Sequence, residues 1–369
     1  MSDDTFILIG TIPWILFALV VYSLSLKIKN LKAFKILFWG SLIFAAIRYG
    51  IGYDYYGYNS VIEGREPDYA LERWEPLSQY LARFCMNIGN SQLFFILTSI
   101  LSLLPIYIVT KKLSISSEFS FGIYLLFPMF FLESIGVIRN GVAYSISLLT
   151  YYFLYRKKIV YALLFFVISI GFHMSSIITI LLFPLYYIVH NKNFNRIAYI
   201  ASLLGSAFII PIISTFFSTG ELGLLFLNKL ENESKGGAIM TILINIIGVF
   251  NLLNWEKLSS FSKSNVIYLT YINFGIILWN LFLPISQTTA LRFSTFFMLY
   301  LILLLPSFPI VFKSKFSRKM IMNFILLLFA ASFFLALKSR FFDNEKEHIA
   351  NIPYQVFFLN PDDRFDYSK

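Results

Sequence analysis

Long apolar runs, separated by short polar connections, dominate this chain from end to end. A helix needs about 20 apolar residues to cross the hydrocarbon core of a bilayer. The alternating ten-residue segments typical of a transmembrane barrel are absent from the sequence. The pattern therefore predicts an all-α, polytopic transmembrane helical bundle of about 12 spans (10–12). The predicted spans are residues 5–26, 36–52, 92–110, 119–135, 141–155, 159–172, 174–190, 197–217, 238–255, 265–284, 292–312 and 320–337.

Composition supports a membrane protein over a soluble one. Of 369 residues, 58% are hydrophobic and 14% are charged, and the mean hydropathy is +0.72. With 42 Phe and 23 Tyr, too few polar residues remain to coat a soluble domain of this size. The first residues are acidic, so we expect the first apolar run to stay as an anchor rather than act as a cleavable signal. The single cysteine, Cys85, excludes an intramolecular disulfide.

The net charge of +10 is distributed according to membrane topology. Basic residues gather in alternate connections, such as 27–35, 156–158 and 313–319, which predicts that these connections face the cytoplasm. No nucleic-acid partner is expected. The connections 53–91 and 218–237 and the tail 338–369 then lie in the periplasm, as parts of a single integral membrane domain covering residues 1–369. Within 53–91, we expect residues 74–88 to form a helix along the membrane interface.

Three arginines from separate segments, Arg48, Arg139 and Arg292, fall on the predicted outer face. Charges at membrane depth are costly and usually functional. A guanidinium offers a planar fork of donors that suits phosphate oxygens. Two structural alternatives stay open: Arg48 can extend toward lipid headgroups, and Arg139 can form an ion pair with Glu133.

One histidine, His173, interrupts the apolar run ISIGFHMSSI at residues 168–177. The predicted topology puts it at the outer mouth of two spans, where imidazole can accept a proton near neutral pH. Ser175 and Ser176 can orient the ring or bond the backbone, and a purely structural role for the histidine is the alternative. There is no HExxH pattern, no metal-spaced carboxylate pair and no GxxxxGK[ST] loop, so neither a metal nor any other cofactor is expected.

Six short motifs occur in a recognisable order along the chain. They are RYGIGYDYYGY (48–58), WEP (74–76), IRNGVA (138–143), GFHMSS (171–176), LRF (291–293) and IPYQ (352–355). In this order the sequence resembles the EpsG-like branch of Wzy-type polysaccharide polymerases. It departs from the pattern at Asn140, where many members have Gln, and at Met174, where many have Pro or Tyr.

This resemblance implies a metal-independent glycosyltransferase with a fold similar to the membrane glycosyltransferases of the C type. Such proteins act on the outer face of the bacterial inner membrane. They join undecaprenyl-diphosphate-linked oligosaccharide repeat units into O-antigen of lipopolysaccharide, capsule or exopolysaccharide. The resemblance also implies contact with membrane lipid and a partner that regulates chain length.

The same resemblance suggests roles for individual residues. His173 is the expected base, with Asp54 as the alternative, and Arg139 and Arg292 are expected to hold the diphosphate. The remaining substrate-binding candidates are Arg48, Tyr53, Tyr55 and Glu75. The tyrosines can stack on sugars or, equally, form an aromatic belt at the interface. A ligase for finished polysaccharide and a flippase for the lipid-linked unit are the competing functions, although few charges lie at mid-depth and no related halves are visible.

Overall fold

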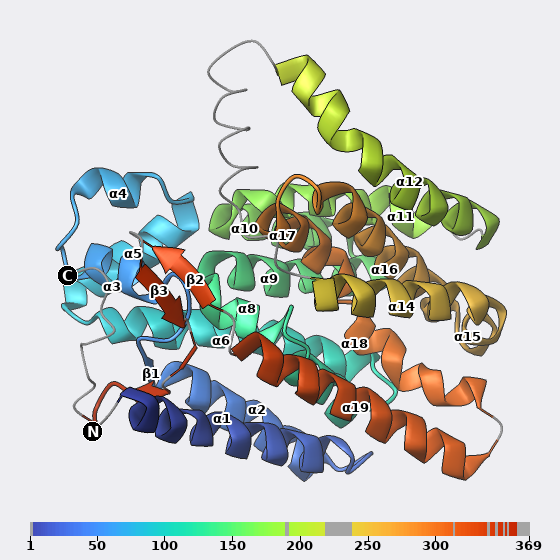
Figure 1. Cartoon of the computed structure of the whole chain (residues 1–369), viewed down its shortest axis with the longest axis horizontal. Helices are drawn as coiled ribbons and strands as arrows, with labels where there is room; N and C mark the ends of the chain where they lie inside the picture. Colours follow the sequence, from blue (N-terminus) through green and yellow to red (C-terminus); the bar gives the residue numbers. More distant parts are fainter. Residues whose placement is uncertain are drawn as a thin grey trace. The chain divides into compact units, whose positions relative to one another are not determined.

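The computed structural model describes residues 3–188, 192–217, 238–312, 314–337, 340–343, 346–349, 351–352 and 354–359. The chain divides into two compact units: unit 1 comprises residues 1–177 and 314–369, and unit 2 comprises residues 178–313. Helices make up most of the described part, which confirms the all-α prediction (Figure 1). Two short antiparallel sheets of two strands each accompany the helices. The predicted 218–237 connection lies outside the described residues.

Unit 1 contains most of the predicted motifs. Its elements are α1 (Asp3–Ser25), α2 (Leu31–Ala46), β1 (Arg48–Tyr49), α3 (Tyr55–Ile62), α4 (Asp68–Glu72), α5 (Pro76–Ile88), α6 (Ser91–Leu113), α7 (Ser117–Leu126), α8 (Phe131–Gly136), α9 (Ile138–Tyr155), α10 (Ile159–Phe172), α19 (Lys315–Leu337), β2 (Arg340–Asp343), β3 (Lys346–Ile349) and β4 (Gln355–Val356). The 3-10 helix η1 (Met174–Leu181) follows α10.

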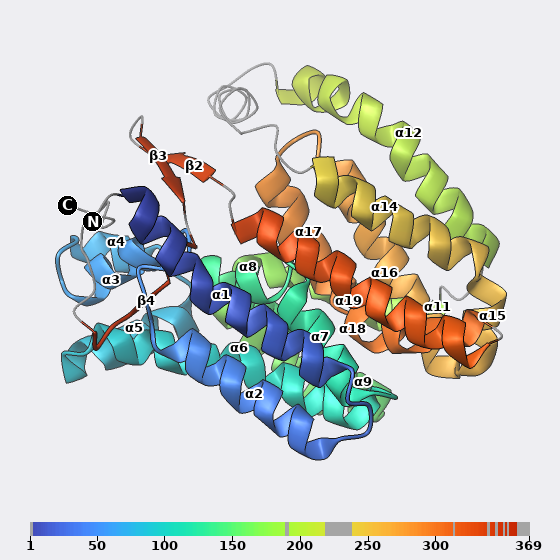
Figure 2. The same ribbon diagram turned by 60° about the horizontal axis from the view of Figure 1, so that its bottom comes forward.

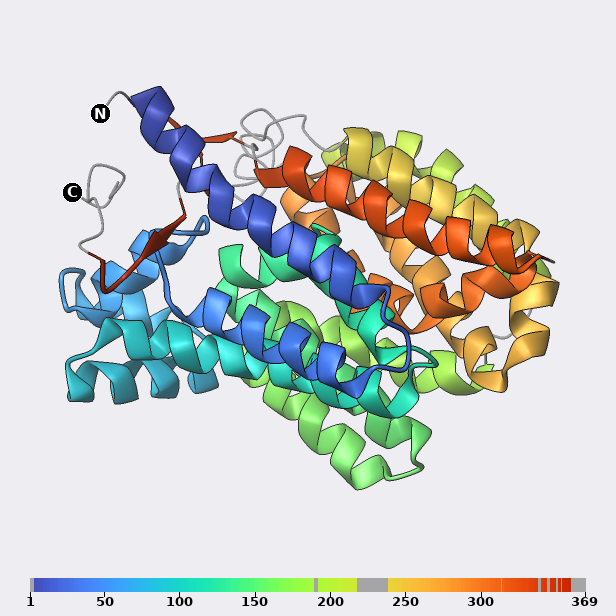
Figure 3. The same cartoon turned by 90° about the horizontal axis from the view of Figure 1, so that it is seen from below.

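The first helices of unit 1 form a hairpin that packs on α6 and α7. Asn30 begins α2 by accepting a hydrogen bond from the Ala33 amide at 3.0 Å, and Asn90 begins α6 in the same way. Helix α19 returns from late in the sequence to lie beside α1, so that α1 runs between α2 and α19 (Figure 2, Figure 3). Helices α1 and α19, far apart in sequence, therefore belong to the same compact unit.

A short C-terminal segment, residues 351–352 and 354–359, packs against α1, α2 and β1. Strand β4 pairs with β1 in antiparallel register, with Arg48 opposite Val356. The Trp14 indole donates to the Asn351 carbonyl at 2.8 Å, and the Tyr354 ring stacks on Phe44 with centroids 4.2 Å apart. The IPYQ motif is thus part of the packing of α1 and α2.

The 53–91 region is a packed helical layer rather than an open loop. Helices α3, α4 and α5 enclose a small core in which Tyr55, Tyr58 and Cys85 contact Phe94 and Phe95 of α6. The predicted helix over 74–88 is present as α5, which begins with Pro76 in its first turn and ends at Gly89 in the left-handed conformation.

Unit 2 is organised around one long helix. Its elements after η1 are α11 (Leu182–Ile188), α12 (Lys192–Phe217), α14 (Ala238–Leu253), α15 (Trp255–Phe261), α16 (Lys263–Phe282), α17 (Gln287–Met298), α18 (Leu301–Leu304) and η2 (Leu305–Val311). Helix α16 packs against α12, α14 and α17. Asn273 donates to Asn195 Oδ1 at 2.9 Å, and Asn280 donates to Asn245 Oδ1 at 3.1 Å. Interhelical amide pairs of this kind hold helices together where lipid gives no hydrophobic driving force.

Within the described residues, four helical segments are long and apolar enough to cross a membrane, or five if the bent pair α14–α15 counts as one span. The four are Ser91–Leu113, Lys263–Phe282, Gln287–Val311 and Lys315–Leu337, and they coincide with four predicted spans. Several other predicted spans form shorter helices, such as α10 with 14 residues, so the number twelve is not confirmed. The protein is a multi-pass membrane protein.

Candidate functional site

The candidate site lies in unit 1, at one end of the hairpin formed by α9 and α10. These helices are joined by residues 156–158 and pack along their length, so the start of α9 and the end of α10 come together. Arg139 is in the first turn of α9, and His173 directly follows α10. Helix α5 adds Glu75, its N-terminal cap residue. Ser78 Oγ of α5 donates to the Phe172 carbonyl at 2.9 Å, which holds the start of α5 beside the end of α10.

Close packing between α5 and α10 requires a residue without a side chain. A Cβ atom on Gly171 would lie 2.7 Å from Leu77 of α5. Glycine at this position lets α5 approach the end of α10, and this approach brings Glu75 to His173. The GFH motif is therefore partly a packing motif.

Arg139 is held by both charge and aromatic contacts. Its Nη1 donates to Glu75 Oε2 at 2.6 Å and its Nε donates to the Tyr58 hydroxyl at 2.8 Å. The guanidinium lies over the Trp74 ring at 5.2 Å and the Tyr58 ring at 5.7 Å. The side chain of Arg139 retains 22% exposure, and that of Glu75 retains 17%. Neither prediction for Arg139 included this pairing with Glu75, which replaces the expected pair with Glu133.

Electrostatics keep Arg139 charged. Burial disfavours the charged form, but Tyr58, Glu75 and Asp54 outweigh it, so the pKa of Arg139 is raised above its ordinary value. Burial, with the negative charge of Asp54, raises the pKa of Tyr58, so its hydroxyl stays neutral and accepts from Arg139 Nε. Asp54 therefore belongs to the electrostatic environment of this cluster.

Glu75 connects the arginine to the histidine. Its second oxygen, Oε1, accepts a hydrogen bond from the Met174 amide at 2.9 Å and lies 3.9 Å from His173 Nδ1. The same Nδ1 lies 3.1 Å from the Ser175 amide nitrogen and 2.8 Å from Ser175 Oγ. Ser175 Oγ is in turn 2.9 Å from Asn140 Oδ1. We call Asp54, Tyr58, Trp74, Glu75, Arg139, Asn140, His173 and Ser175 the Arg139 cluster.

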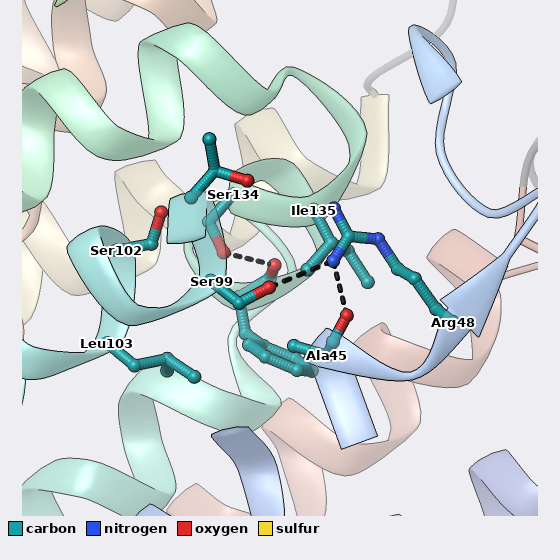
Figure 4. Close-up of a pocket in the computed structure, with 9 residues that line it drawn as sticks. Ala45, Arg48, Ser99, Ser102, Leu103, Ser134 and Ile135 are labelled. Atoms are coloured by element: carbon teal, nitrogen blue, oxygen red, sulfur yellow. Dashed lines mark hydrogen bonds between the residues drawn. The ribbon is translucent and has the colours of Figure 1, made fainter. Parts of the chain in front are cut away.

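Arg48 does not lie in the Arg139 cluster. It is 1% exposed, and its Nη1 donates to the Ala45 carbonyl and, at 3.0 Å, to Ser99 Oγ. Figure 4 shows Arg48 reaching toward Ser99, with Ser102 and Ser134 lining the same narrow cavity. The expected position at an exposed outer face is therefore not met, and this arginine joins α2 to α6 in the interior.

The two candidate tyrosines separate. Tyr55 is 1% exposed and stacks on Phe95 with centroids 4.1 Å apart, so its ring is not open to a sugar. Tyr53 is 39% exposed, next to α8. Tyr53 precedes α3, whereas Tyr55 is the first residue of α3 and packs into the small core, which explains the difference.

Arg292 lies in α17 of unit 2 and is half-buried. Its Nε has no hydrogen-bond partner among the described residues, and the described part of the chain gives it no ion pair. No group of three or more His, Cys, Asp or Glu side chains in the described ranges could hold a metal ion.

The sequence analysis assigned no contact to Trp74 or Asn140, and for Ser175 it considered only contacts with the ring or the backbone. Their neighbours along the chain were the available signal, since each is adjacent to or two residues from a candidate residue in the WEP, IRN and FHMS motifs.

A comparison with protein-family models gives one decisive match. Residues 10–356 match the model of the EpsG family. The chain belongs to the EpsG family. This family consists of Wzy-like polysaccharide polymerases and related glycosyltransferase-like membrane proteins. The match ends at Val356, so it includes β4, the part of the C-terminal segment that pairs with β1. No curated protein and no solved structure matches the chain.

Proposed function

We propose that this EpsG-family protein polymerises undecaprenyl-diphosphate-linked oligosaccharide repeat units on the outer face of the bacterial inner membrane. The proposal rests on the contacts of Glu75. It pairs with Arg139 and accepts a hydrogen bond from the Met174 amide, next to His173, so three segments far apart in sequence meet at this carboxylate. Ionisable groups gathered at the partly exposed end of a helical hairpin are typical of a reaction centre.

The reaction requires one bond to form and one to break. The acceptor hydroxyl oxygen attacks the anomeric carbon of the donor sugar, and the carbon–oxygen bond to the lipid diphosphate breaks with its electron pair on the diphosphate. The hydroxyl proton passes to a base, for which His173 is the first candidate in the Arg139 cluster and Asp54 the alternative. The lipid diphosphate leaves as an anion that hydrogen-bond donors and cations stabilise.

The charge balance of the cluster limits what Arg139 does alone. Glu75 and Asp54 provide two negative charges against one guanidinium. Arg139 therefore contributes hydrogen-bond donors more than net positive charge. Arg292, in unit 2, remains a separate candidate for binding phosphate oxygens, since its Nε has no hydrogen-bond partner among the described residues.

Contacts with sugars and lipid follow from exposure. Tyr53 remains the candidate for stacking on a sugar ring. Helix α5 exposes Tyr80, Phe84 and Ile88 along one face, at spacings of four residues, and leads directly into the span α6. We propose that this face lies in the membrane interface, where aromatic residues favour the headgroup level. The proposal also includes a fold of about twelve spans similar to the C-type glycosyltransferases, no metal requirement, and a partner that regulates chain length.

Complementation tests this function. A host lacking its own polymerase would receive the native glycan locus with wild type, Arg139→Ala or the control Arg65→Ala, an arginine whose side chain is 36% exposed. We expect a polymer ladder with wild type and Arg65→Ala, and single repeat units with Arg139→Ala at equal protein level. Lipid-linked units held on the cytoplasmic side would indicate a flippase, and transfer of preformed polymer to a lipid core would indicate a ligase.

A further inference from the structure

Two glycines meet where the segment that follows β1 crosses the end of α8. The φ angle of Gly52 is +105°, in the region that favours glycine. A Cβ atom on Gly52 would overlap the Ile135 carbonyl oxygen and lie 2.9 Å from the Cα atom of Gly136. Both neighbours are backbone atoms, so no side-chain rotation could relieve the overlap. We call this contact the Gly52–Gly136 crossing.

A backbone hydrogen bond joins the crossing to the start of α3. The Asp54 amide donates to the Gly136 carbonyl at 3.2 Å, and Asp54 is the N-terminal cap residue of α3. A Cβ atom on Gly136 would lie 3.3 Å from Cδ2 of the Tyr53 ring, closer than an ordinary van der Waals contact. The start of α3 is therefore fixed against Gly136, the last residue of α8.

From the crossing, a closed series of contacts leads to Arg139 and back. Tyr58 lies one turn along α3, and its amide donates to the Asp54 carbonyl at 3.0 Å. The Tyr58 hydroxyl accepts from Arg139 Nε at 2.8 Å. Arg139 is in the first turn of α9, three residues after Gly136. Helix α3 is thus held to the α8–α9 segment both at the crossing and at the bond between Tyr58 and Arg139.

The second contact is sensitive to the first. Carbon atoms pack at about 3.5–4 Å, so a Cβ atom on Gly52 would push the two backbones apart by about 1 Å. An N–H···O hydrogen bond spans only about 2.7–3.2 Å, and this shift would break the bond of Tyr58 to Arg139 unless a side chain followed. The Tyr58 ring has little room to follow, because it packs against Trp74 and Phe94 with centroids 4.7 and 5.7 Å away.

We infer that Gly52 and Gly136 are positioning residues, whose contact sets the distance between Tyr58 of α3 and Arg139 of α9. They act through the Arg139 cluster and not by touching a substrate. Their effect on polymer formation rests on the proposed function, whereas their effect on the contact between Tyr58 and Arg139 does not.

Alanine substitutions test the effect on activity. The assay is the conversion of lipid-linked repeat units to polymer in membrane vesicles, normalised to protein level. A misplacement of about 1 Å costs about 100-fold in rate, which is the loss we expect for Gly52→Ala. Gly57→Ala is the matched control, because a Cβ atom on Gly57 of α3 meets nothing within 4 Å, and it should stay near the wild-type rate. Gly136→Ala, which crowds only the Tyr53 ring, should show a smaller loss and serves if Gly52→Ala does not accumulate.

A second substitution separates positioning from a general loss of stability. Tyr58→Phe removes the hydroxyl that accepts from Arg139 and keeps the buried ring, and we expect it to lose about 10-fold. In the Tyr58→Phe background, Gly52→Ala should cost less than in wild type by more than about 3-fold, because the contact that it disturbs is already absent. A cost that agrees within about 3-fold in the two backgrounds would overturn the inference, as would wild-type activity of Tyr58→Phe or of Gly52→Ala.

Hydrogen exchange decides the structural part without any assay of function. Purified protein in lipid nanodiscs would be followed by mass spectrometry. We expect Gly52→Ala to speed exchange in residues 53–62 and to leave α6 unchanged, and Gly57→Ala to alter neither. Equal exchange in Gly52→Ala and wild type contradicts the inference. Faster exchange in α6 of both Gly52→Ala and Gly136→Ala does so as well, because the glycines would then stabilise the whole unit rather than position α3.

The two failures can be told apart. If wild type itself forms no polymer in the complemented host, the proposed function fails, and the exchange result still decides whether the crossing fixes α3. If wild type forms polymer and Gly52→Ala behaves like Gly57→Ala, only the inference fails.

Discussion

Replacing Glu75 by glutamine tests whether Arg139 and Glu75 act as a unit. The ion pair is short, 2.6 Å, and both side chains are more than three-quarters buried. Hydrogen bonds to charged groups contribute about 1.5–3 kcal/mol when little screened. At 1.4 kcal/mol per factor of ten, this corresponds to about a 10- to 150-fold loss of activity for Glu75→Gln. The amide would also place an N–H group against Arg139 Nη1 or the Met174 amide, both of which are donors.

A double-mutant cycle gives the sharper result. If Glu75 serves mainly to hold Arg139, then Glu75→Gln with Arg139→Gln should be no worse than the more damaging single change, within about 3-fold. The assay is the rate of conversion of lipid-linked repeat units to polymer in membrane vesicles, normalised to protein level. Glu63→Gln is the matched control, because its ion pair with Arg65 is 2.9 Å long but exposed, and should change the rate less than about 5-fold. Losses that multiply in the double mutant would refute the reasoning.

Three further predictions concern the packing of unit 1. Gly171→Ala should lower activity, because its Cβ would overlap Leu77; Leu77→Ala in the same chain should restore it, and Gly40→Ala, which meets open space, should be neutral. If Gly171→Ala behaves like Gly40→Ala, the close approach of α5 and α10 is unimportant. Burial raises the pKa of Cys85 to about 11, so at pH 8 a maleimide should label this single cysteine only after unfolding, and fast labelling of folded protein would contradict its burial. Tyr354→Ala should lower the melting temperature in detergent far more than Tyr354→Phe, since loss of a buried ring costs about 3–5 kcal/mol and loss of one hydrogen bond about 0.5–1.5 kcal/mol. Equal shifts would show that the ring packing contributes little.

The sequence predicts the membrane class and the important segments well, because both depend on local pattern. Four predicted spans coincide with helices long enough to cross a bilayer, and the amphipathic stretch 74–88 forms α5. Arg139 and His173 were also identifiable, since an ionisable residue in an apolar run is conspicuous in a single sequence.

The partners of these residues were not predictable in the same way. Arg139 pairs with Glu75, 64 positions away, and not with Glu133, six positions away. The pairing of Arg139 with Glu75 depends on the packing of α5 against α10. This close packing is possible because Gly171 has no side chain. The burial of Arg48 was not predictable for a similar reason, because its contacts are with Ser99 and Phe95, about 50 residues further along.

The C-terminal segment has a consequence for how the protein is made. The Trp14 indole finds its acceptor 337 residues later, at Asn351, and the Gly10 carbonyl accepts from the Tyr354 amide. During synthesis these two groups of α1 therefore lack their partners until residues 351–354 have been made. Unit 1 cannot reach its final packing before that point. A nonsense mutation just before β4 should then leave the earliest helix incompletely packed and the protein exposed to degradation.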